Sequence, residues 1–379
     1  GRNMKRTPRN ADYTKNYNRN LVLRLLRHRQ MSRADLAAAS GLTRASVSLI
    51  VEELQRQGVV EELEPTATKR GRTPLPLAIR GGVYCAVGVY LNRSGCQMGV
   101  VDLNGTLLEK RSFSPEACSD AAALVSAAAE LLAQAQPDGS KMLGIGVSAP
   151  GPLDSGEGRI LNPPGFARWH GAPVCQMLTE KTGQPVWLEN NACTLAQYYC
   201  EAKGLRDALL LLVDSGVGSG VISGGRLLQS GGGFTSELGH TTIDFNGRPC
   251  SCGGRGCLEA YAAVPNLLRD TAYTSWRQLV ENAAQGAPDA AELLEQEAAY
   301  LSAGITNLVN LVDVDTVILT GDISWGFETF RPLLEKRLQG RLIGRTDRAV
   351  ALETMSAETD TQICAAAAAV FRNFLTEPV

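Results

Sequence analysis

The chain has 379 residues, of which 44% are hydrophobic and 20% are charged, a composition typical of a globular protein with two or three domains. It shows neither a signal peptide nor an apolar run long enough to cross a bilayer, so we expect a cytoplasmic protein with no membrane partner. Ten cysteines in a chain of this size fit a reducing compartment better than a disulfide framework.

The net charge of −2 hides a strong asymmetry. Residues 1–80 carry 16 Lys/Arg and 7 Asp/Glu, a balance of +9, whereas residues 81–379 carry 21 and 32, a balance of −11. A basic head on an acidic body predicts that the head binds a polyanion. Charge alone leaves a solvated basic arm as an equal alternative.

Helical signals fill the basic head. We predict helices over residues 20–29, 32–41 and 44–57. Ser32 can cap the second helix, with Asp35 at the capping-box position, and Gly41 ends it. Thr43 can cap the third helix, and the two valines at 59–60 predict the first strand of a wing.

A helix, a short glycine turn and a second helix form the helix-turn-helix unit, whose second helix enters the major groove of DNA. We predict a winged helix-turn-helix domain over residues 13–70. Its candidate DNA contacts are Arg33, Thr43, Arg44, Ser46 and Ser48. An arginine can bind a guanine edge through two hydrogen bonds, whereas serine discriminates less. The alternative is a small helical bundle that contacts another protein.

A polar, glycine- and proline-containing segment at 68–74 follows the head, and we assign residues 71–82 to a linker. Its Arg-Gly-Arg sequence is narrow enough to enter the minor groove of an A·T-rich operator. We therefore add Arg70 and Arg72 to the DNA contacts; a simple hinge is the alternative.

Strand signals dominate the acidic body. We predict strands over residues 83–90, 97–102, 106–112, 142–147, 186–189, 208–213, 217–223 and 316–320, and helices over 121–135 and 363–374. This alternation predicts two mixed α/β lobes with a cleft between them. We divide them into residues 83–190 with 360–379, and residues 191–359.

Three cysteines and one histidine lie within 18 residues of one another, in the spacing His-x9-Cys-x-Cys-x4-Cys. The four residues are His240, Cys250, Cys252 and Cys257. Four such ligands satisfy a tetrahedral Zn²⁺, and closed Cys3His sites are usually structural. Glycines at 253, 254 and 256 let the backbone turn tightly enough for all three sulfurs to face one ion. Buried or disulfide-bonded cysteines are the alternative, although a Cys-x-Cys pair closes a disulfide poorly.

Several motifs give the body a family resemblance. They are Glu-Leu-Gly-His at 237–240, the Cys/Gly/Glu block at 250–259, Gly-x-Gly-x-Gly at 216–220 and Glu-Asn-Asn-Ala at 189–192. With these motifs the body resembles the ROK family of sugar kinases and sugar-responsive repressors. The resemblance implies an α/β fold of two lobes, of the actin-like (ribonuclease H-like) sugar-kinase type. A winged helix-turn-helix head resembles the repressor branch of that family.

The resemblance also implies a sugar pocket at the cleft between the lobes, and a zinc ion held by His240 would orient that pocket. Asn190, Glu237, His240 and Glu259 match positions that resemble hexose-hydroxyl ligands in the family. Paired hydrogen bonds from carboxylates and amides suit vicinal hydroxyls. Asn162, with a tryptophan at 169, matches the segment that closes over the sugar; an ordinary loop anchored by prolines is the alternative.

Two departures argue against catalysis. Asn191, which we count among the sugar-binding residues, stands where ROK kinases carry the aspartate that takes the proton from the sugar. An amide cannot act as that base, and a positioned base typically contributes about 10²–10⁴ in rate. The family's Asp-x-Gly-Gly-Thr phosphate loop is also missing, because the chain reads Tyr-Leu-Asn-Arg-Ser at 90–94. We therefore expect no enzyme activity.

These observations predict a sugar-responsive transcriptional regulator that represses genes of carbohydrate use. Its expected partners are a double-stranded DNA operator with an inverted repeat, a sugar or sugar-derivative effector, and a second copy of the chain in a homodimer or dimer of dimers. Two alternatives remain: an ATP-dependent sugar kinase with a DNA-binding head, and a regulator controlled by a protein partner.

Overall fold

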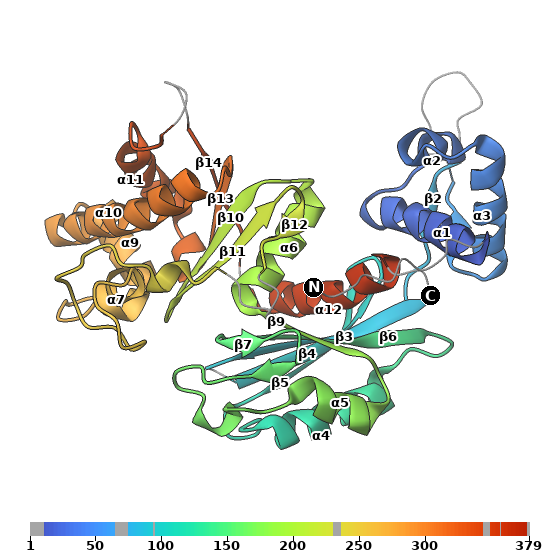
Figure 1. The fold of residues 1–379 in the computed structure, drawn as a ribbon, viewed down its shortest axis with the longest axis horizontal. Helices are drawn as coiled ribbons and strands as arrows, with labels where there is room; N and C mark the ends of the chain where they lie inside the picture. The colour runs from blue at the N-terminus through green and yellow to red at the C-terminus, as the bar shows by residue number, and fades with distance from the viewer. Residues whose placement is uncertain are drawn as a thin grey trace, which may run out of the picture.

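The computed structural model describes residues 11–64, 75–93, 95–229, 236–343, 349–356 and 358–376. A helical head stands beside two lobes, each built on a five-stranded mixed sheet (Figure 1). The predicted α/β fold class is therefore confirmed. No single helix in these ranges is long and apolar enough to cross a membrane; α2 and α3 meet the length and composition together, but as a pair bent by 119°.

The head consists of α1 (Ala11–His28), α2 (Arg33–Ser40), α3 (Arg44–Arg56), β1 (Val60–Glu62) and β2 (Leu77–Ile79). Ser32 and Asp35 form the expected capping box at the start of α2. Gly41 turns the chain toward α3 with a φ of 72°, a conformation that favours glycine. The first helix begins at Ala11, well before the predicted start at Asn20. The two strands pair antiparallel. Strand β2 lies within residues 71–82, which we predicted as a linker, so the head extends beyond the predicted domain end at residue 70.

The first lobe has the strand order β5-β4-β3-β6-β9. The strands are β3 (Tyr84–Asn92), β4 (Gly95–Asp102), β5 (Leu107–Phe113), β6 (Lys141–Ala149) and β9 (Val186–Asn190). Strands β3, β4 and β5 are antiparallel neighbours, whereas β6 and β9 run parallel to β3. Helices α4 (Ala121–Ala135) and α5 (Val174–Thr182) cover one face, and α12 (Thr359–Thr376) covers the other (Figure 1).

Helix α12 lies unusually close to the first sheet. A Cβ atom added at Gly88 would lie 2.0 Å from the carbonyl oxygen of Ile363, and one at Gly146 would lie 1.9 Å from that of Ala366. Only glycine therefore fits at these two positions. The alanines of the helix, which the sequence predicted to be packed, let its backbone reach the sheet.

The second lobe repeats the arrangement, with the order β12-β11-β10-β13-β14. The strands are β10 (Ala208–Val213), β11 (Val217–Ser223), β12 (Arg226–Leu227), β13 (Thr316–Gly321) and β14 (Ala351–Thr354). Helix α6 (Asn191–Lys203) packs on one face; α9 (Trp276–Ala284), α10 (Pro288–Leu311) and α11 (Phe327–Leu338) belong to the core on the other. Short elements complete the fold: β7 (Leu153–Asp154), β8 (Arg159–Ile160), α7 (Glu259–Ala262), α8 (Val264–Leu267) and single turns at Ala167–Trp169, Leu238–His240 and Asp322–Ser324.

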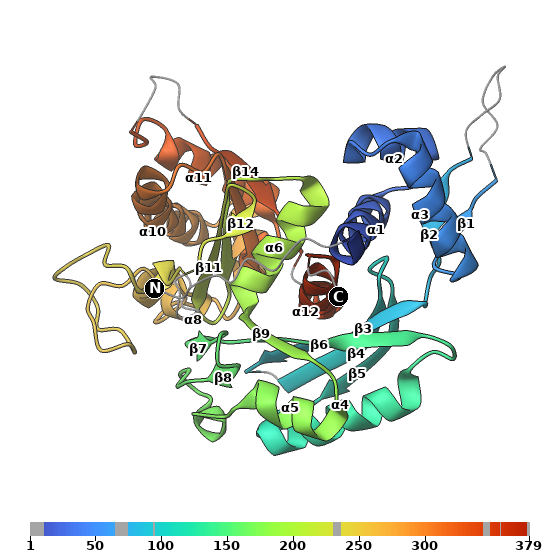
Figure 2. The same cartoon turned by 45° about the vertical axis from the view of Figure 1, so that its right-hand side comes forward.

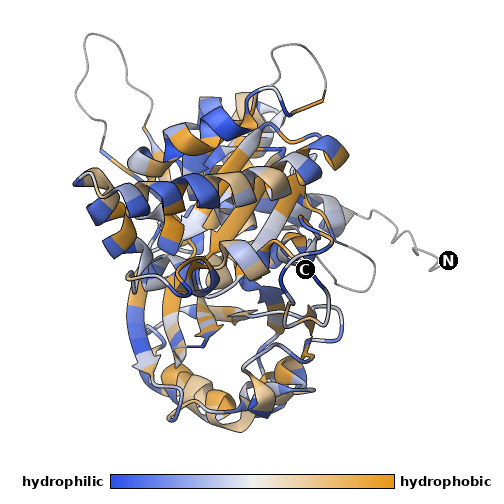
Figure 3. Ribbon diagram, turned by 90° about the vertical axis from the view of Figure 1, so that its left-hand side faces the viewer, coloured by the Kyte–Doolittle hydropathy of each residue, from blue (hydrophilic) through white to orange (hydrophobic). Residues whose placement is uncertain are grey.

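Helices α6 and α12 lie between the two sheets (Figure 2). The strands of both sheets are largely hydrophobic, whereas the helices around them alternate between hydrophobic and hydrophilic residues (Figure 3). The hairpin turns after β3 and β10 both border a pocket between the lobes. This arrangement places the β9–α6 junction, which contains Asn190 and Asn191, at the centre of that pocket.

The head docks on the body through α1. The side-chain amide of Asn20 donates to the carbonyl oxygen of Phe374 over 3.1 Å, and Nε of Arg27 donates to that of Leu103 over 3.2 Å. The Arg27 guanidinium also stacks over the Phe371 ring, 5.2 Å from its centroid. Apolar residues of the head, the first sheet and α12 form one continuous buried cluster.

A buried carboxyl group in α10 gives a test of this core. Glu297 is 1% exposed, and its Oε2 has no hydrogen-bond partner among the described residues. Burial raises the pKa of Glu297 well above its ordinary value of 4.5. The folded protein therefore binds this proton more tightly than the unfolded chain does, and stability falls as the pH rises from the unfolded pKa toward the folded one.

We expect Glu297→Gln to be more stable than the parent protein at pH 7–8, because it removes this ionisable group. Each kcal/mol gained raises Tm by roughly 2–4 °C in a protein of this size or somewhat smaller. The difference in stability between Glu297→Gln and the parent should shrink as the pH falls toward the pKa of this carboxyl group in the unfolded chain. Thermal unfolding across this pH range measures it, with the exposed Glu292→Gln on the same helix as the control. An equal response of both variants would contradict the assignment.

Candidate functional site

The histidine and the three cysteines of the predicted zinc motif come together. One ligand atom from each of His240, Cys250, Cys252 and Cys257 lies within 4.8 Å of all the others. The sulfurs of Cys252 and Cys257 are 3.7 Å apart, and Nδ1 of His240 is 3.6 Å from the sulfur of Cys250. A tetrahedral Zn²⁺ about 2.3 Å from two sulfurs separates them by about 3.8 Å. The donor set and its spacing therefore fit zinc.

Glycines shape the cysteine loop, as the sequence predicted. Gly256 has a φ of 67°, and a Cβ atom there would lie 1.6 Å from the carbonyl oxygen of Asp244. The amide of Cys250 donates to Gly254 over 2.9 Å, which closes the turn. The loop is thus folded by backbone contacts that bring the sulfurs to one point.

The same loop connects two acidic residues of the pocket. Glu237 directly precedes the turn that ends at His240, and Glu259 begins α7 two residues after Cys257. Between them the amide of Leu258 donates to the carbonyl oxygen of Thr241 over 2.9 Å. The His/Cys cluster therefore lies between the two carboxylates in the chain and brings together the segments that carry them.

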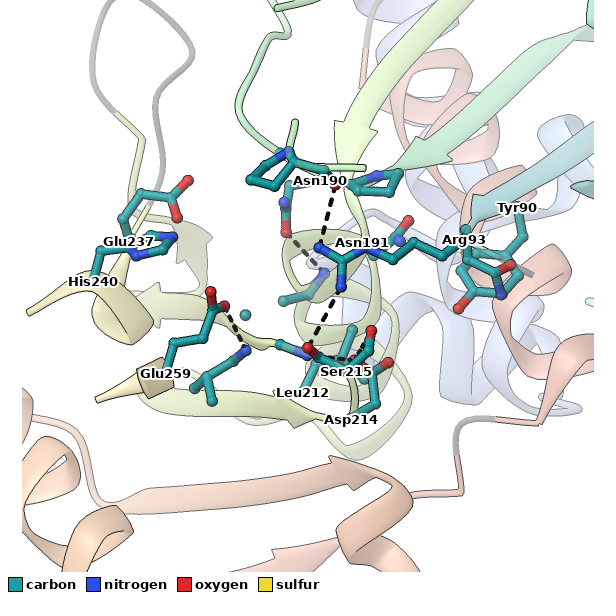
Figure 4. Close-up of a pocket in the computed structure, with 18 residues that line it drawn as sticks. Tyr90, Arg93, Asn190, Asn191, Leu212, Asp214, Ser215, Glu237, His240 and Glu259 are labelled. Atoms are coloured by element: carbon teal, nitrogen blue, oxygen red, sulfur yellow. Dashed lines mark hydrogen bonds between the residues drawn. The ribbon is translucent and has the colours of Figure 1, made fainter. Parts of the chain in front are cut away.

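These side chains line a cavity of about 140 Å³ between the lobes. Figure 4 shows Glu237 and His240 on one side, Glu259 below them and Asn190 above. The cavity thus contains four of the predicted sugar-binding residues, and Asn191 also lines it.

Each acidic group has a defined environment. Oε2 of Glu259 accepts from the backbone amide of Val217 over 3.0 Å, and a Cβ at Gly216 would lie 2.9 Å from that oxygen, so glycine leaves room for the carboxylate. Glu237 is exposed through the open side of the pocket. Enough protein surrounds it that burial raises its pKa; His240 lowers it, and the negative charge of Glu259 raises it further.

The two asparagines at the β9–α6 junction act differently. Oδ1 of Asn190 caps α6 by accepting from the amide of Ala192 over 2.9 Å, which leaves its NH₂ group as the polar end for a ligand. Asn191 is buried, and both ends of its side-chain amide form hydrogen bonds within the protein. Its Oδ1 accepts from the hydroxyl of Ser148 over 2.7 Å, and its Nδ2 donates to the carbonyl oxygen of Leu91 over 3.2 Å.

Arg93 crosses the pocket, a contact that the sequence did not predict. Its Nη1 lies 3.4 Å from the carbonyl oxygen of Ser215 in the second lobe, and its Nη2 lies 3.3 Å from that of Pro164 in the first (Figure 4). The guanidinium thus occupies space at the end of β3, in the segment that lacks the family's Asp-x-Gly-Gly-Thr pattern. The absence of the Asp-x-Gly-Gly-Thr pattern was the only sequence signal of this difference.

The loop at 161–166 contributes Pro164 to the pocket, but Asn162 is exposed and is not among the lining residues. Trp169 is 4% exposed and packs in the core of the first lobe. A sugar contact by Asn162 therefore stays a prediction.

In the head, Arg44 and Thr43 are exposed at the start of α3, while Ser46 and Ser48 are partly exposed. Thr43 caps the helix, and its hydroxyl lies 2.9 Å from that of Ser46. Arg33 contacts Glu62 and donates to Gln55 over 3.1 Å, so the head itself binds this guanidinium. The structure adds Leu49 of α3, which is 68% exposed and is not among the predicted DNA contacts. Arg70 and Arg72 lie outside the described residues.

The fold and the pocket define a protein of the two-lobed, actin-like sugar-kinase class with an added helical head. More specifically, the chain belongs to the ROK family, whose model matches residues 86–372. The predicted family resemblance is therefore confirmed.

Two relatives that match more than four fifths of the chain are described as repressors. The chain is 29% identical to the xylose repressor of Bacillus subtilis (strain 168), over 82% of this chain and 83% of that protein. It is 25% identical to the DNA-binding transcriptional repressor Mlc of Escherichia coli (strain K12), over 92% of this chain and 91% of Mlc.

Solved structures share the fold. A ROK family transcriptional regulator, described as a homologue of E. coli MLC, covers 96% of this chain and is itself covered to 98%, with a TM-score of 0.78 and 22% identity. A ROK hexokinase from Thermus thermophilus is 33% identical, with a TM-score of 0.61. It covers 75% of this chain but is itself covered to 96%, so about a quarter of this chain has no counterpart in the kinase.

Two glycines of the cysteine loop give a matched test of the site. Both Gly253 and Gly256 have positive φ, but a Cβ at Gly253 meets nothing within 4 Å, whereas one at Gly256 collides with Asp244. We expect Gly253→Ala to cost about 1–2 kcal/mol of unfolding free energy from backbone strain alone. Gly256→Ala should cost clearly more. Urea unfolding of both variants measures the difference, and equal costs would contradict the described loop geometry.

Proposed function

We propose that this protein is a transcriptional repressor that binds a sugar or sugar derivative in a non-catalytic pocket and thereby controls genes of carbohydrate use. One observation carries the proposal: a helical head of the DNA-binding type is joined to a pocket that gathers Asn190, Glu237, His240 and Glu259. Carboxylates and an amide at one point suit the vicinal hydroxyls of a sugar. The similarity to repressors over more than four fifths of the chain supports the regulatory role.

The contacts of Asn191 support binding without phosphoryl transfer. Its amide donates to one neighbour and accepts from another, so no group at this position can take a proton from a sugar hydroxyl. Arg93 spans the cleft beside it.

We assign His240, Cys250, Cys252 and Cys257 to a structural zinc ion. Zinc bound there would join the segments that carry the two pocket carboxylates. Because Nδ1 of His240 faces the cysteines, its Nε2 remains for the sugar, and a metal-bound imidazole is well oriented for that contact.

For the head, we propose that α3 enters the major groove with Arg44 and Ser46 near its start. The exposed Leu49 adds an apolar group that can contact a thymine methyl. A dimer on an inverted repeat follows from the usual match between protein and operator symmetry. Arg33 is a positioning residue within the head in this proposal, because Glu62 and Gln55 hold it.

A thermal-shift screen of free, N-acetylated and phosphorylated sugars tests the pocket. We expect at least one sugar to raise Tm, because a ligand specific for the folded state adds about 2.7 kcal/mol at a hundred times its Kd. Glu237→Gln and Glu259→Gln should each raise the Kd for that sugar by roughly 10- to 100-fold, since hydrogen bonds to charged groups contribute about 1.5–3 kcal/mol.

Glu109→Gln, an exposed change on β5, should bind the sugar like the parent protein. No shift with any sugar would favour control by a protein partner instead. Release of ADP from ATP in the presence of a hexose would show that the pocket is catalytic.

Removal of zinc gives an independent prediction. Chelation, or Cys252→Ser, should abolish the sugar response of the full-length protein at conditions where it still shifts operator DNA in a gel, because the cluster lies in the second lobe and not in the head. Metal content by mass spectrometry and sugar binding by calorimetry accompany the gel. Cys175→Ser, at a half-buried cysteine of α5, is the control. Loss of both activities together would mean that the cluster holds the whole fold.

A further inference from the structure

A cavity of about 690 Å³ lies where the head meets the body. Its walls come from α1 of the head, from α6, from the segments around β11 and β12, and from the end of α12. In Figure 2, α1 and α6 are seen on either side of α12. A volume of this size is typical of sites for small organic ligands. It shares no lining residue with the sugar pocket.

Arginine dominates the charged part of this cavity. Five arginines and only one carboxylate, that of Glu201, line it. The arginines are Arg24 and Arg27 of α1, Arg206 and Arg226 of the second lobe, and Arg372 of α12. Such a gathering stands out in a body whose net charge is negative. Guanidinium groups bind phosphate and carboxylate oxygens through paired hydrogen bonds.

The single carboxylate does not neutralise this charge. One oxygen of Glu201 accepts from Arg372, and the other lies 3.9 Å from Nη1 of Arg27. The other three arginines, at positions 24, 206 and 226, form no ion pair with an acidic side chain in the described part of the chain.

Two donors at this cavity have no acceptor. Nε of Arg24 and Nη2 of Arg372 are buried, and neither has a hydrogen-bond partner among the residues that the structure describes. Arg372 uses its other nitrogens, donating to Glu201 and, over 2.8 Å, to Gln197. Buried polar groups are nearly always paired. Two arginines at the wall of this cavity therefore keep a donor that the protein leaves unused, and a rotation of either guanidinium group would turn it toward an anion in the cavity.

The remaining lining is apolar. Leucines and an isoleucine from the head, the second lobe and α12 face the same space: Leu21, Leu25, Leu205, Ile222, Leu227 and Leu375. A bare inorganic ion would leave this surface in contact with water. A ligand with a carbon skeleton beside its anionic group would cover it.

We propose that this cavity is a second ligand site, which binds a small organic phosphate ester at the joint between the head and the body. The phosphate accepts from the arginines with free donors, and the organic part lies against the leucines. Because its walls come from α1 on one side and α6 and α12 on the other, an occupant contacts the head and the body at once.

Phenyl phosphate is a suitable probe, because it carries no sugar and so does not depend on the proposed sugar pocket. We expect it to raise Tm of the full-length protein more than inorganic phosphate does at equal ionic strength, and phenol to have no effect. Arg24→Gln and Arg226→Glu should each raise its Kd by about 10-fold or more in calorimetry, the range for hydrogen bonds to charged groups.

Arg226 is exposed, so its variant should keep the fold. It therefore tests the proposal even if the change at Arg24 destabilises the head. Arg331→Gln, on the surface of α11, is the control for loss of positive charge and should bind like the parent protein. Unchanged affinity in both cavity variants would overturn the proposal, because the anion would then bind elsewhere. Equal affinity for inorganic phosphate and phenyl phosphate would overturn the assignment to an organic ester.

Discussion

The relation between the two lobes depends on helices that touch the sheets with no side chain between them. Helix α12 lies against Gly88 and Gly146, and a Cβ at Gly220 would lie 2.8 Å from both the carbonyl oxygen of Ala192 and the Cβ of Ala196 in α6. Such contacts leave no room for adjustment, because packed interiors respond to a single added methyl group. Since α6 and α12 also pack on each other, the spacing of the two sheets is fixed, and with it the width of the pocket between their turns.

Helix α6 also connects the pocket between the lobes with the cavity beside the head. Its first turn carries Asn190 and Asn191 in the pocket, and its last turn carries Glu201 beside Arg27 of the head. Asn191 and Glu201 are ten positions apart, which corresponds to about 15 Å at the rise of an α-helix. A rigid element therefore touches both sites. Coupling between the two sites requires that a ligand favour one position of α6 over another. A shift of α6 would change the ion pair between Glu201 and Arg27 at its C-terminal end.

Much of the fold was predictable from the sequence, because local signals were strong. The capping box at Ser32, the glycine turn at Gly41 and the short cysteine spacing each specify geometry within a few residues, and the structure has all three. The early start of α1 was not predictable, since its first turns are polar and carry no apolar stripe.

The contacts in the two sites that the sequence did not predict join residues that lie far apart in the chain. Arg93 is separated from Ser215 by 122 positions, and the junction cavity gathers arginines from distant segments. No local sequence pattern predicts such contacts, because they depend on how the two lobes and the head pack together. The exposed Leu49 was not predicted as a DNA contact either, because the local pattern does not show which apolar side chains the rest of the head leaves uncovered.

The pocket also shows why recognition and catalysis separate so easily on this fold. A kinase must stabilise a transition state, and so it needs a base and a phosphate cradle in addition to groups that hold the sugar. A sensor needs only that the sugar bind one conformation better than another. At Asn191 a carboxylate would face the carbonyl oxygen of Leu91, whereas the amide donates to it. If proton transfer is not required, the amide is the better-satisfied group at this buried position, while the two carboxylates beside the His/Cys cluster serve the sugar binding that we propose.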